Sequence, residues 1–278
     1  MTTDKIILGT VQFGCEYGIN SAGHPDTDMV REILKEAARS GIRTLDTSSA
    51  YGNAESVLGE CMLPESGFNI ISKYPKQDRS VSDVFSESLK RLHKKHLYGY
   101  LMHHFSIYRE HPSVWNDFVR LRDNGLVDRI GFSLYSPEEL EIILNDNIDF
   151  NLVQIPRNIF DRKFDPYLPE LKRRGVEIHV RSTFLQGLFF KDRYKLPEKL
   201  LPLGKYLLEL DSIAQNTEMG IVQLALGFNI QNDMIDKVLI GVDNVSQLRD
   251  NINSIPEKPV NPDIRVMEQE LLNPVNWN

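Results

Sequence analysis

Four side chains with acid–base chemistry follow three consecutive strand-like segments: Asp46 and Tyr51 in TLDTSSAYG, Lys73 in NIISKYP and His103 in YGYLMHHF. A free phenol has a pKa of about 10, and a neighbouring ammonium such as that of Lys73 lowers this pKa. A carboxylate at Asp46 would hold the ammonium in its charged form. Because an imidazole can orient a carbonyl oxygen, the set predicts a site that protonates a carbonyl while its carbon accepts a hydride.

Each of these residue types also has an ordinary structural role. A lone Asp at a strand end usually caps a turn, a lone Tyr usually packs in the core, and a lone Lys usually extends its charge to solvent. Their ordered occurrence after adjacent strands is what favours a functional site.

The elements that must position these residues alternate regularly along the chain. Amphipathic segments are typical of helices: one runs from Val30 to Ala38 and stops at Gly41, as a helix often does. Ser136, followed by Pro137 and by Glu139, has the pattern of a helix N-terminus. Short apolar segments bounded by Gly, Asp, Ser or Pro are typical of buried parallel strands; they are KIILGTV, IRTLDTS, NIISKY, LYGYLMH, RIGFSL, LVQIP, VEIHVRS and KVLIGV.

Eight strand signals separated by helix signals predict a parallel sheet with right-handed crossovers. Eight strands close a (β/α)8 TIM barrel of the α/β class, and the length suits one barrel domain over residues 1–278. The alternative is an open doubly wound sheet, but no GxGxxG fingerprint follows any strand. A barrel carries its chemistry at the carboxyl ends of its strands, where Asp46, Lys73 and His103 stand.

Composition excludes several classes of protein. The chain has 278 residues, 41% of them hydrophobic, and a net charge of −7 with no basic block, so we expect no nucleic-acid partner. Cys15 and Cys61 are too few for a disulfide framework or a thiolate metal site, and we expect no metal. No apolar stretch is long enough to span a membrane. We therefore expect a cytoplasmic protein, while its oligomeric state stays open.

Segments throughout the chain resemble the aldo-keto reductase family. GIRTLDTSSAYGNAESVLGE at 41–60 is similar to the family signature GxxxxDTAxxYGxxExxLG. The segments LGTVQFG, SKYP, LMHHF, IGFSLYSPEEL, VQIPRN, RSTFLQGLF, IVQLALGF and LIGVDNVSQLRDNI also resemble family segments. The resemblance implies a barrel in which Tyr51 is the general acid, Lys73 paired with Asp46 tunes it, and His103 orients the carbonyl. His104 is the alternative to His103, although strand register favours His103.

The resemblance also implies a nicotinamide cofactor, NADPH first with NADH still possible, bound extended across the barrel. Ser133 and Gln154 would contact its carboxamide, and Thr10 and Val11 its nicotinamide side. The remaining implied cofactor residues are a pyrophosphate loop with Ser182, Phe184, Gln186 and Gly187, and an adenine-ribose end with Gly241, Val242, Gln247 and Asn251.

Four positions depart from the family pattern. Leu134 replaces an Asn that grips the carboxamide. Arg181 stands where many members place an aromatic ring against the nicotinamide, so it either stacks on the cofactor, holds a phosphate or carboxylate of the substrate, or forms a structural ion pair. Gly241 and Gln247 replace cations that select the 2′-phosphate, and Asp243 adds a negative charge, so discrimination in favour of NADPH should be weak.

The leading functional hypothesis is an NAD(P)H-dependent reductase or alcohol dehydrogenase that acts on a small polar aldehyde, ketone or sugar. Gln12, His104, Arg157 and Arg181 form a polar rim that would bind substrate hydroxyls or a phosphate. One alternative is a cofactor-binding regulatory protein with little turnover, against which the intact set of four residues argues. Another is a lyase that forms a Schiff base on Lys73, a mechanism that does not require Asp46 and Tyr51.

Overall fold

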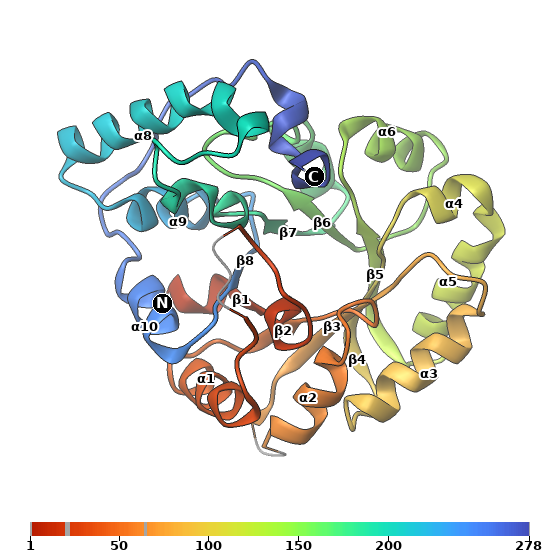
Figure 1. Ribbon diagram of the computed structural model, residues 1–278. Helices are drawn as coiled ribbons and strands as arrows, with labels where there is room; N and C mark the ends of the chain where they lie inside the picture. The colour runs from red at the N-terminus through yellow and green to blue at the C-terminus, as the bar shows by residue number, and fades with distance from the viewer. Residues whose placement is uncertain (1, 20–22, 64–65, 278) are drawn as a thin grey trace.

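The fold is a closed barrel of eight parallel strands, seen along its axis in Figure 1. This computed structural model describes residues 2–19, 23–63 and 66–277. The strands pair in chain order, and β1 closes the barrel by pairing with β8. The strands are β1 (Ile6–Gly9), β2 (Thr44–Asp46), β3 (Asn69–Tyr74), β4 (Leu97–Met102), β5 (Val127–Ser133), β6 (Leu152–Pro156), β7 (Glu177–Arg181) and β8 (Lys237–Gly241). The prediction of a (β/α)8 barrel is confirmed.

Helices surround the barrel (Figure 1), and two of them, α8 and α9, come between β7 and β8 in the chain. The helices are α1 (Thr27–Arg39), α2 (Ala54–Cys61), α3 (Val81–Arg91), α4 (Ser106–Glu110), α5 (Trp115–Asp123), α6 (Pro137–Asn145), α7 (Leu168–Arg173), α8 (Gly204–Thr217), α9 (Ile221–Ile230) and α10 (Val245–Asn253). None of the helices in the described part of the chain combines the length and hydropathy that a membrane crossing needs.

Local sequence signals explain where several helices begin and end. Asp26 accepts a hydrogen bond from the Met29 amide at 2.8 Å and so caps α1. After α1, Gly41 has a φ of +86°, a left-handed conformation that favours glycine at a helix C-terminus. The Glu139 carboxylate of α6 accepts from the Ser136 amide at 3.2 Å, which confirms the predicted capping box.

Strand alternation decides which side chains enter the barrel. Outward-facing side chains pack under the helices in the main hydrophobic cluster, whereas Ile7, Ile71, Leu101 and Leu152 form a separate cluster inside. Lys73 lies two residues after Ile71 on the same strand, so its side chain points to the same interior. The barrel interior is therefore apolar in its middle and polar near the carboxyl ends of the strands.

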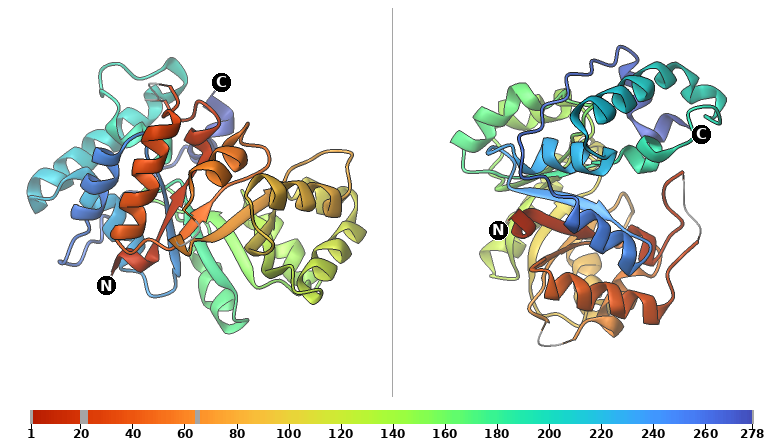
Figure 2. Two further views of the ribbon diagram at one scale, coloured as in Figure 1. Left: turned by 90° about the horizontal axis from the view of Figure 1, so that it is seen from below. Right: turned by 90° about the vertical axis from the view of Figure 1, so that its left-hand side faces the viewer.

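The two ends of the chain lie at opposite ends of the barrel (Figure 2). The N-terminal 3₁₀ turn (Thr2–Lys5) leads directly into β1 and so lies at the amino ends of the strands. The C-terminal residues Asn273, Pro274 and Val275 line a pocket at the other end, together with Tyr51 and His103. The mouth that holds the predicted site is thus covered in part by the end of the chain.

Candidate active site

Asp46 and Lys73 form a buried ion pair at the carboxyl ends of β2 and β3. The Lys73 Nζ lies 2.5 Å from the Asp46 Oδ1 and donates a second hydrogen bond to the Thr47 carbonyl at 2.9 Å. The Lys73 side chain is 0% exposed. Burial lowers the pKa of Lys73, and the charge and hydrogen bond of Asp46 oppose this shift. The pair is fixed further by Gln154, whose Nε2 donates to the other Asp46 oxygen at 2.8 Å.

Tyr51 lies beside this pair, in the loop after β2. The Lys73 Nζ lies 5.1 Å from the centroid of the Tyr51 ring, and the ring meets that of His103 edge to face at 5.6 Å. Gly14 and Gly52 hold this loop in place: a Cβ on Gly52 would lie 2.2 Å from the Gly14 carbonyl oxygen, and one on Gly14 would lie 2.0 Å from that of Tyr51. Only glycines permit so close a contact between the loops after β1 and β2.

The predicted direction of the Tyr51 pKa is wrong for this structure. Burial raises the pKa of Tyr51 well above 10, and the negative charge of Asp46 adds to the rise. The positive charge of Arg181 opposes it. The Lys73 ammonium is committed to Asp46 and Thr47, so it does not offset the desolvation of the phenol. Tyr51 is therefore fully protonated at neutral pH, as a proton donor must be.

His103 is held as a neutral imidazole. Its Nδ1 lies 3.1 Å from the Ser48 Oγ, so Nε2 is the ring nitrogen left to meet a ligand in the pocket that His103 lines. Burial lowers the pKa of His103 to about 2, with further lowering by the charges of Lys73, His104 and Arg181. A neutral imidazole beside Tyr51 can orient a carbonyl oxygen without competing for the proton.

The rings of His103, His104 and Tyr135 stack in a row. His104 lies 4.8 Å from His103 at 26°, and Tyr135 lies 6.4 Å from His104 at 1°. His103 and Tyr135 line a pocket of about 210 Å³ with Tyr51, whereas His104 is not among its lining residues. This arrangement favours His103 over His104 as the residue that meets the substrate, the choice that strand register predicts.

A second, longer hollow of about 480 Å³ leads from Tyr51 across the barrel mouth to α10. Tyr17, Tyr51, Gln154, Arg181 and Gln186 line both hollows, so the two are continuous. Most of the residues that the family resemblance assigns to the cofactor line the longer groove: Thr10, Val11, Gln154, Arg181, Ser182, Phe184, Gln186, Gly187, Gly241, Gln247 and Asn251. The groove thus runs past every predicted contact region except that of Ser133, which lines the smaller pocket.

Unsatisfied polar atoms show that the groove fits a hydroxyl-rich ligand. The Gln12 Oε1 and the Asp243 Oδ1 are buried and accept no hydrogen bond from the described residues, and both residues line the groove. Ribose hydroxyls and a carboxamide can donate to such acceptors. Ser182, Leu185 and Gln186 have positive φ values of 62°, 46° and 52°, and strained backbone of this kind collects at functional loops. The residues present therefore suit a dinucleotide.

Four predicted site residues lie elsewhere, and one of them, His104, lines neither hollow. Arg157 forms a bidentate pair with Asp165 at 2.7 and 3.1 Å and donates to Asn229 at 2.8 Å, so its charge is satisfied away from the substrate pocket. Val242 is 1% exposed and belongs to the hydrophobic core. Gln12, predicted to contact substrate, lines the cofactor groove instead.

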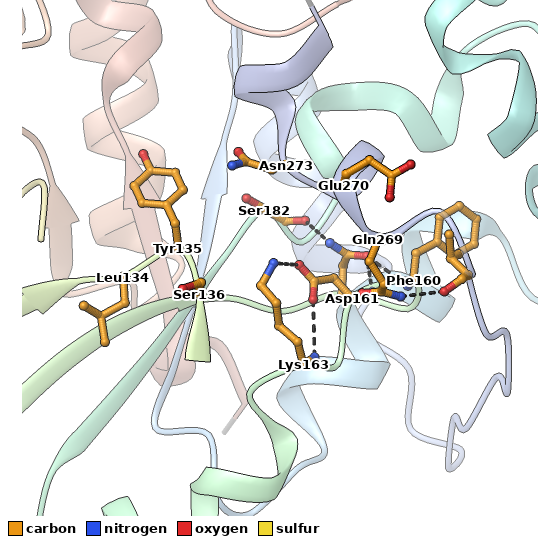
Figure 3. Close-up of polar contacts among 12 residues, drawn as sticks. Leu134, Tyr135, Ser136, Phe160, Asp161, Lys163, Ser182, Gln269, Glu270 and Asn273 are labelled. Atoms are coloured by element: carbon orange, nitrogen blue, oxygen red, sulfur yellow. Dashed lines mark hydrogen bonds and ion pairs between the residues drawn. The ribbon is translucent and has the colours of Figure 1, made fainter. Parts of the chain in front are cut away.

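Sequence reasoning missed several lining residues because they come from loops. Figure 3 shows two of them, Tyr135 and Asn273, which come from the loop after β5 and from the C-terminal segment. Tyr135 and Asn273 line the small pocket, and Tyr17 lines both hollows. Tyr135 lies inside IGFSLYSPEEL, a segment that resembles the family, and Tyr17 lies close to the segment LGTVQFG. No local pattern marked the C-terminal residues.

A barrel whose mouth joins a buried acid–base set to a long groove is the arrangement of a barrel enzyme. The sequence profile of the Aldo/keto reductase family matches residues 5–265. The chain therefore belongs to the aldo/keto reductase family, which makes it an NAD(P)-dependent oxidoreductase.

Individual relatives are distant. Glyoxal reductase from Bacillus subtilis is 23% identical over 216 residues, which cover 73% of this chain and 70% of that protein. An aldo-keto reductase from Bacillus halodurans, solved in its holo form, has a TM-score of 0.77 at 20% identity and covers 93% and 89% of the two chains. One from Klebsiella pneumoniae, solved with NADP and acetate, has a TM-score of 0.68 at 18% identity, covering 98% and 90%. At these identities the structural likeness shows the fold alone.

Proposed function

We propose that the protein is an NADPH-dependent carbonyl reductase in which Tyr51 protonates the carbonyl oxygen. The observation that carries this proposal is the neutral pair of Tyr51 and His103 in one pocket, beside a groove that suits a dinucleotide. A bound nicotinamide cofactor would supply a hydride to the carbonyl carbon. Tyr51 donates its proton to the carbonyl oxygen, so that hydride and proton together convert the carbonyl to an alcohol, and the phenolate then regains a proton from solvent.

The residues around Tyr51 have separate tasks in this reaction. His103 positions the carbonyl oxygen, and the buried pair of Lys73 and Asp46 fixes the loop and the charge below the phenol. Preorganised polar groups of this kind act strongly in a site that excludes water. Thr10, Val11, Ser133 and Gln154 would hold the nicotinamide end.

NADPH is the first cofactor to test because structural relatives, including the one from Klebsiella pneumoniae, were solved with NADP. The small pocket, at about 210 Å³, is below the ~300–1,000 Å³ of pockets for drug-sized ligands. We therefore propose a small polar aldehyde, ketone or sugar as the substrate.

Turnover tests this function directly. Purified protein is mixed with NADPH or NADH and a panel of small aldehydes, ketones and aldoses, and loss of the reduced cofactor's absorbance is followed. Consumption of cofactor that depends on a carbonyl compound supports a reductase. Tight cofactor binding without turnover of any compound would instead support a regulatory protein, and a borohydride-trapped adduct on Lys73 would support a lyase.

The lyase alternative has little support in the geometry. Lys73 is fully buried, and its ammonium donates to both Asp46 and the Thr47 carbonyl. A Schiff base needs a neutral amine that the substrate can reach.

A further inference from the structure

We infer that Arg181 binds a carboxylate of the substrate, so that the enzyme reduces small carbonyl compounds that carry an acid group. This inference rests on the proposed function and adds the substrate class. It starts from the charge of the small pocket. Apart from Arg181, its lining within the described chain consists of uncharged side chains: Tyr17, Tyr51, His103, Ser133, Tyr135, Gln154, Gln186, Asn273, Pro274 and Val275.

Arg181 has no counter-charge in the described part of the protein. Its Nη2 donates to the Leu134 carbonyl at 3.0 Å, its Nη1 lies 3.4 Å from the Ser182 Oγ, and its Nε has no acceptor. These are uncharged partners for two of the five N–H groups of a guanidinium. By contrast, the cation of Lys163 is paired with Asp161 at 2.9 Å (Figure 3). An uncompensated charge in a partly buried site is costly, and an anionic ligand removes that cost.

The anchors of the guanidinium hold it against the small pocket, at the point where that pocket joins the cofactor groove that Arg181 also lines. Its central carbon lies 4.2 Å from the centroid of the Tyr135 ring. Tyr135 lines the small pocket and not the cofactor groove. The guanidinium also donates to the carbonyl of Leu134, the residue before Tyr135 in the loop after β5. Of the roles that the sequence left open for Arg181, stacking on the nicotinamide and a structural ion pair are therefore less well supported than an anion-binding role.

The charge of Arg181 also reaches the reacting groups. It opposes the rise in the pKa of Tyr51 and contributes to the low pKa of His103. A substrate must place its carbonyl between Tyr51 and His103 and its acid group at Arg181. The carbonyl and the acid group must therefore be close together in the molecule. A guanidinium binds a carboxylate through two parallel hydrogen bonds, and the small pocket admits only a short compound.

The test uses short carbonyl compounds that carry an acid group and matched neutral partners: succinic semialdehyde with butanal, pyruvate with pyruvamide, and glycolaldehyde phosphate with glycolaldehyde. We expect kcat/KM for each carboxylate to exceed that of its neutral partner by about 10- to 100-fold. Arg181→Gln should remove most of this preference. The readout is the ratio of kcat/KM for each carboxylate to that for its neutral partner, because Arg181 also lines the cofactor groove and its loss can lower both values. Arg181→Lys should restore part of the preference. Lys76→Gln removes a charge from the rim outside the pocket and should leave the preference intact.

A second measurement does not depend on turnover or on the variants being fully active. Succinate, but not succinamide, should raise the thermal unfolding temperature of the wild-type protein, and Arg181→Gln should lose this effect. Equal use of charged and neutral compounds, without protection by succinate, would overturn the inference and leave the reductase function intact. A preference for the phosphate over the carboxylates, or an equal loss on all compounds with weaker cofactor binding in Arg181→Gln, would also overturn it. Failure of every compound to consume cofactor contradicts the proposed function instead, and protection by succinate then still decides the role of Arg181.

Discussion

Tyr51 and His103 work in their neutral forms because burial disfavours the charged form of each. The pKa of Tyr51 is raised well above 10 and that of His103 is lowered to about 2. A general acid with a raised pKa stays protonated until the pH exceeds that pKa, and an imidazole with a lowered pKa stays neutral above it. Both groups therefore keep the form needed for reduction across the physiological range.

This gives a prediction for the pH dependence of reduction. With a neutral aldehyde, kcat/KM should vary little from about pH 6 to about pH 9, because neither group titrates there. The profile of initial rates at subsaturating substrate measures this. An acid limb near the ordinary pKa of histidine that disappears in His103→Asn would contradict the neutral assignment.

The residues at the α10 end of the groove give a second prediction, on the choice between NADPH and NADH. Asp243, Gln247, Asp250 and Asn251 line this end, and Arg249 is paired with Glu36 at 2.7 Å on the neighbouring helix α1. Asp243→Asn removes a negative charge at the end of the groove where the family resemblance would place the 2′-phosphate. The ratio of kcat/KM for NADPH to that for NADH should rise about two- to tenfold. Asp233→Asn, an exposed change outside the groove, should leave the ratio as in the wild type. A falling ratio would place the phosphate elsewhere.

At the scale of elements, the strands were predictable because buried parallel strands are continuously apolar. Alternation along each strand then placed Asp46, Lys73 and His103 on the inner face. The positions of loop residues could not be predicted in this way. Where Tyr135 and Asn273 lie depends on the tertiary contacts of the segments that carry them. Arg157 looked like a substrate residue, but its partner Asn229 lies on α9, 72 residues along the chain.

The lower end of the barrel provides a contrast to the mouth. Glu177 on β7 accepts hydrogen bonds from Tyr98 at 2.6 Å and lies 2.7 Å from Arg129 and 2.6 Å from His179. Burial would raise the pKa of Glu177, but its partners, His179 first, outweigh this and lower the pKa to about 2. Polar networks at the amino ends of barrel strands serve stability rather than catalysis.

Glu177→Gln should therefore lower stability without changing the site. A lowered folded-state pKa contributes stability that is present above about pH 4.5 and is lost as the pH falls towards about 2. The variant should lose about 1–3 kcal/mol at neutral pH, a fall of roughly 2–10 °C in Tm, and the loss should shrink in acid. Glu209→Gln, exposed on α8, is the control. An unchanged Tm at neutral pH would show that the network contributes nothing.

At the scale of the whole molecule, the barrel separates stability from chemistry. The apolar interior cluster of Ile7, Ile71, Leu101 and Leu152 supports the polar layer above it. Loops after β1, β2, β5 and β7 and the C-terminal segment surround that layer. The separation of an apolar interior from a polar mouth could be predicted, because the sequence shows where each strand ends. The sequence could not show burial, and the direction of the Tyr51 pKa follows from burial.

The central claim is that one phenolic hydroxyl delivers the proton, and Tyr51→Phe tests it most directly. Tyr17→Phe is the matched control. Tyr17 lines the same two hollows, but the ring that packs against His103 is that of Tyr51. Both variants should bind NADPH with the affinity of the wild type, as measured by fluorescence titration. Tyr51→Phe should lower kcat for carbonyl reduction by about 10²–10⁴-fold, whereas Tyr17→Phe should retain most of it. Wild-type turnover in Tyr51→Phe, with cofactor binding intact, would contradict the assignment of Tyr51 as the acid.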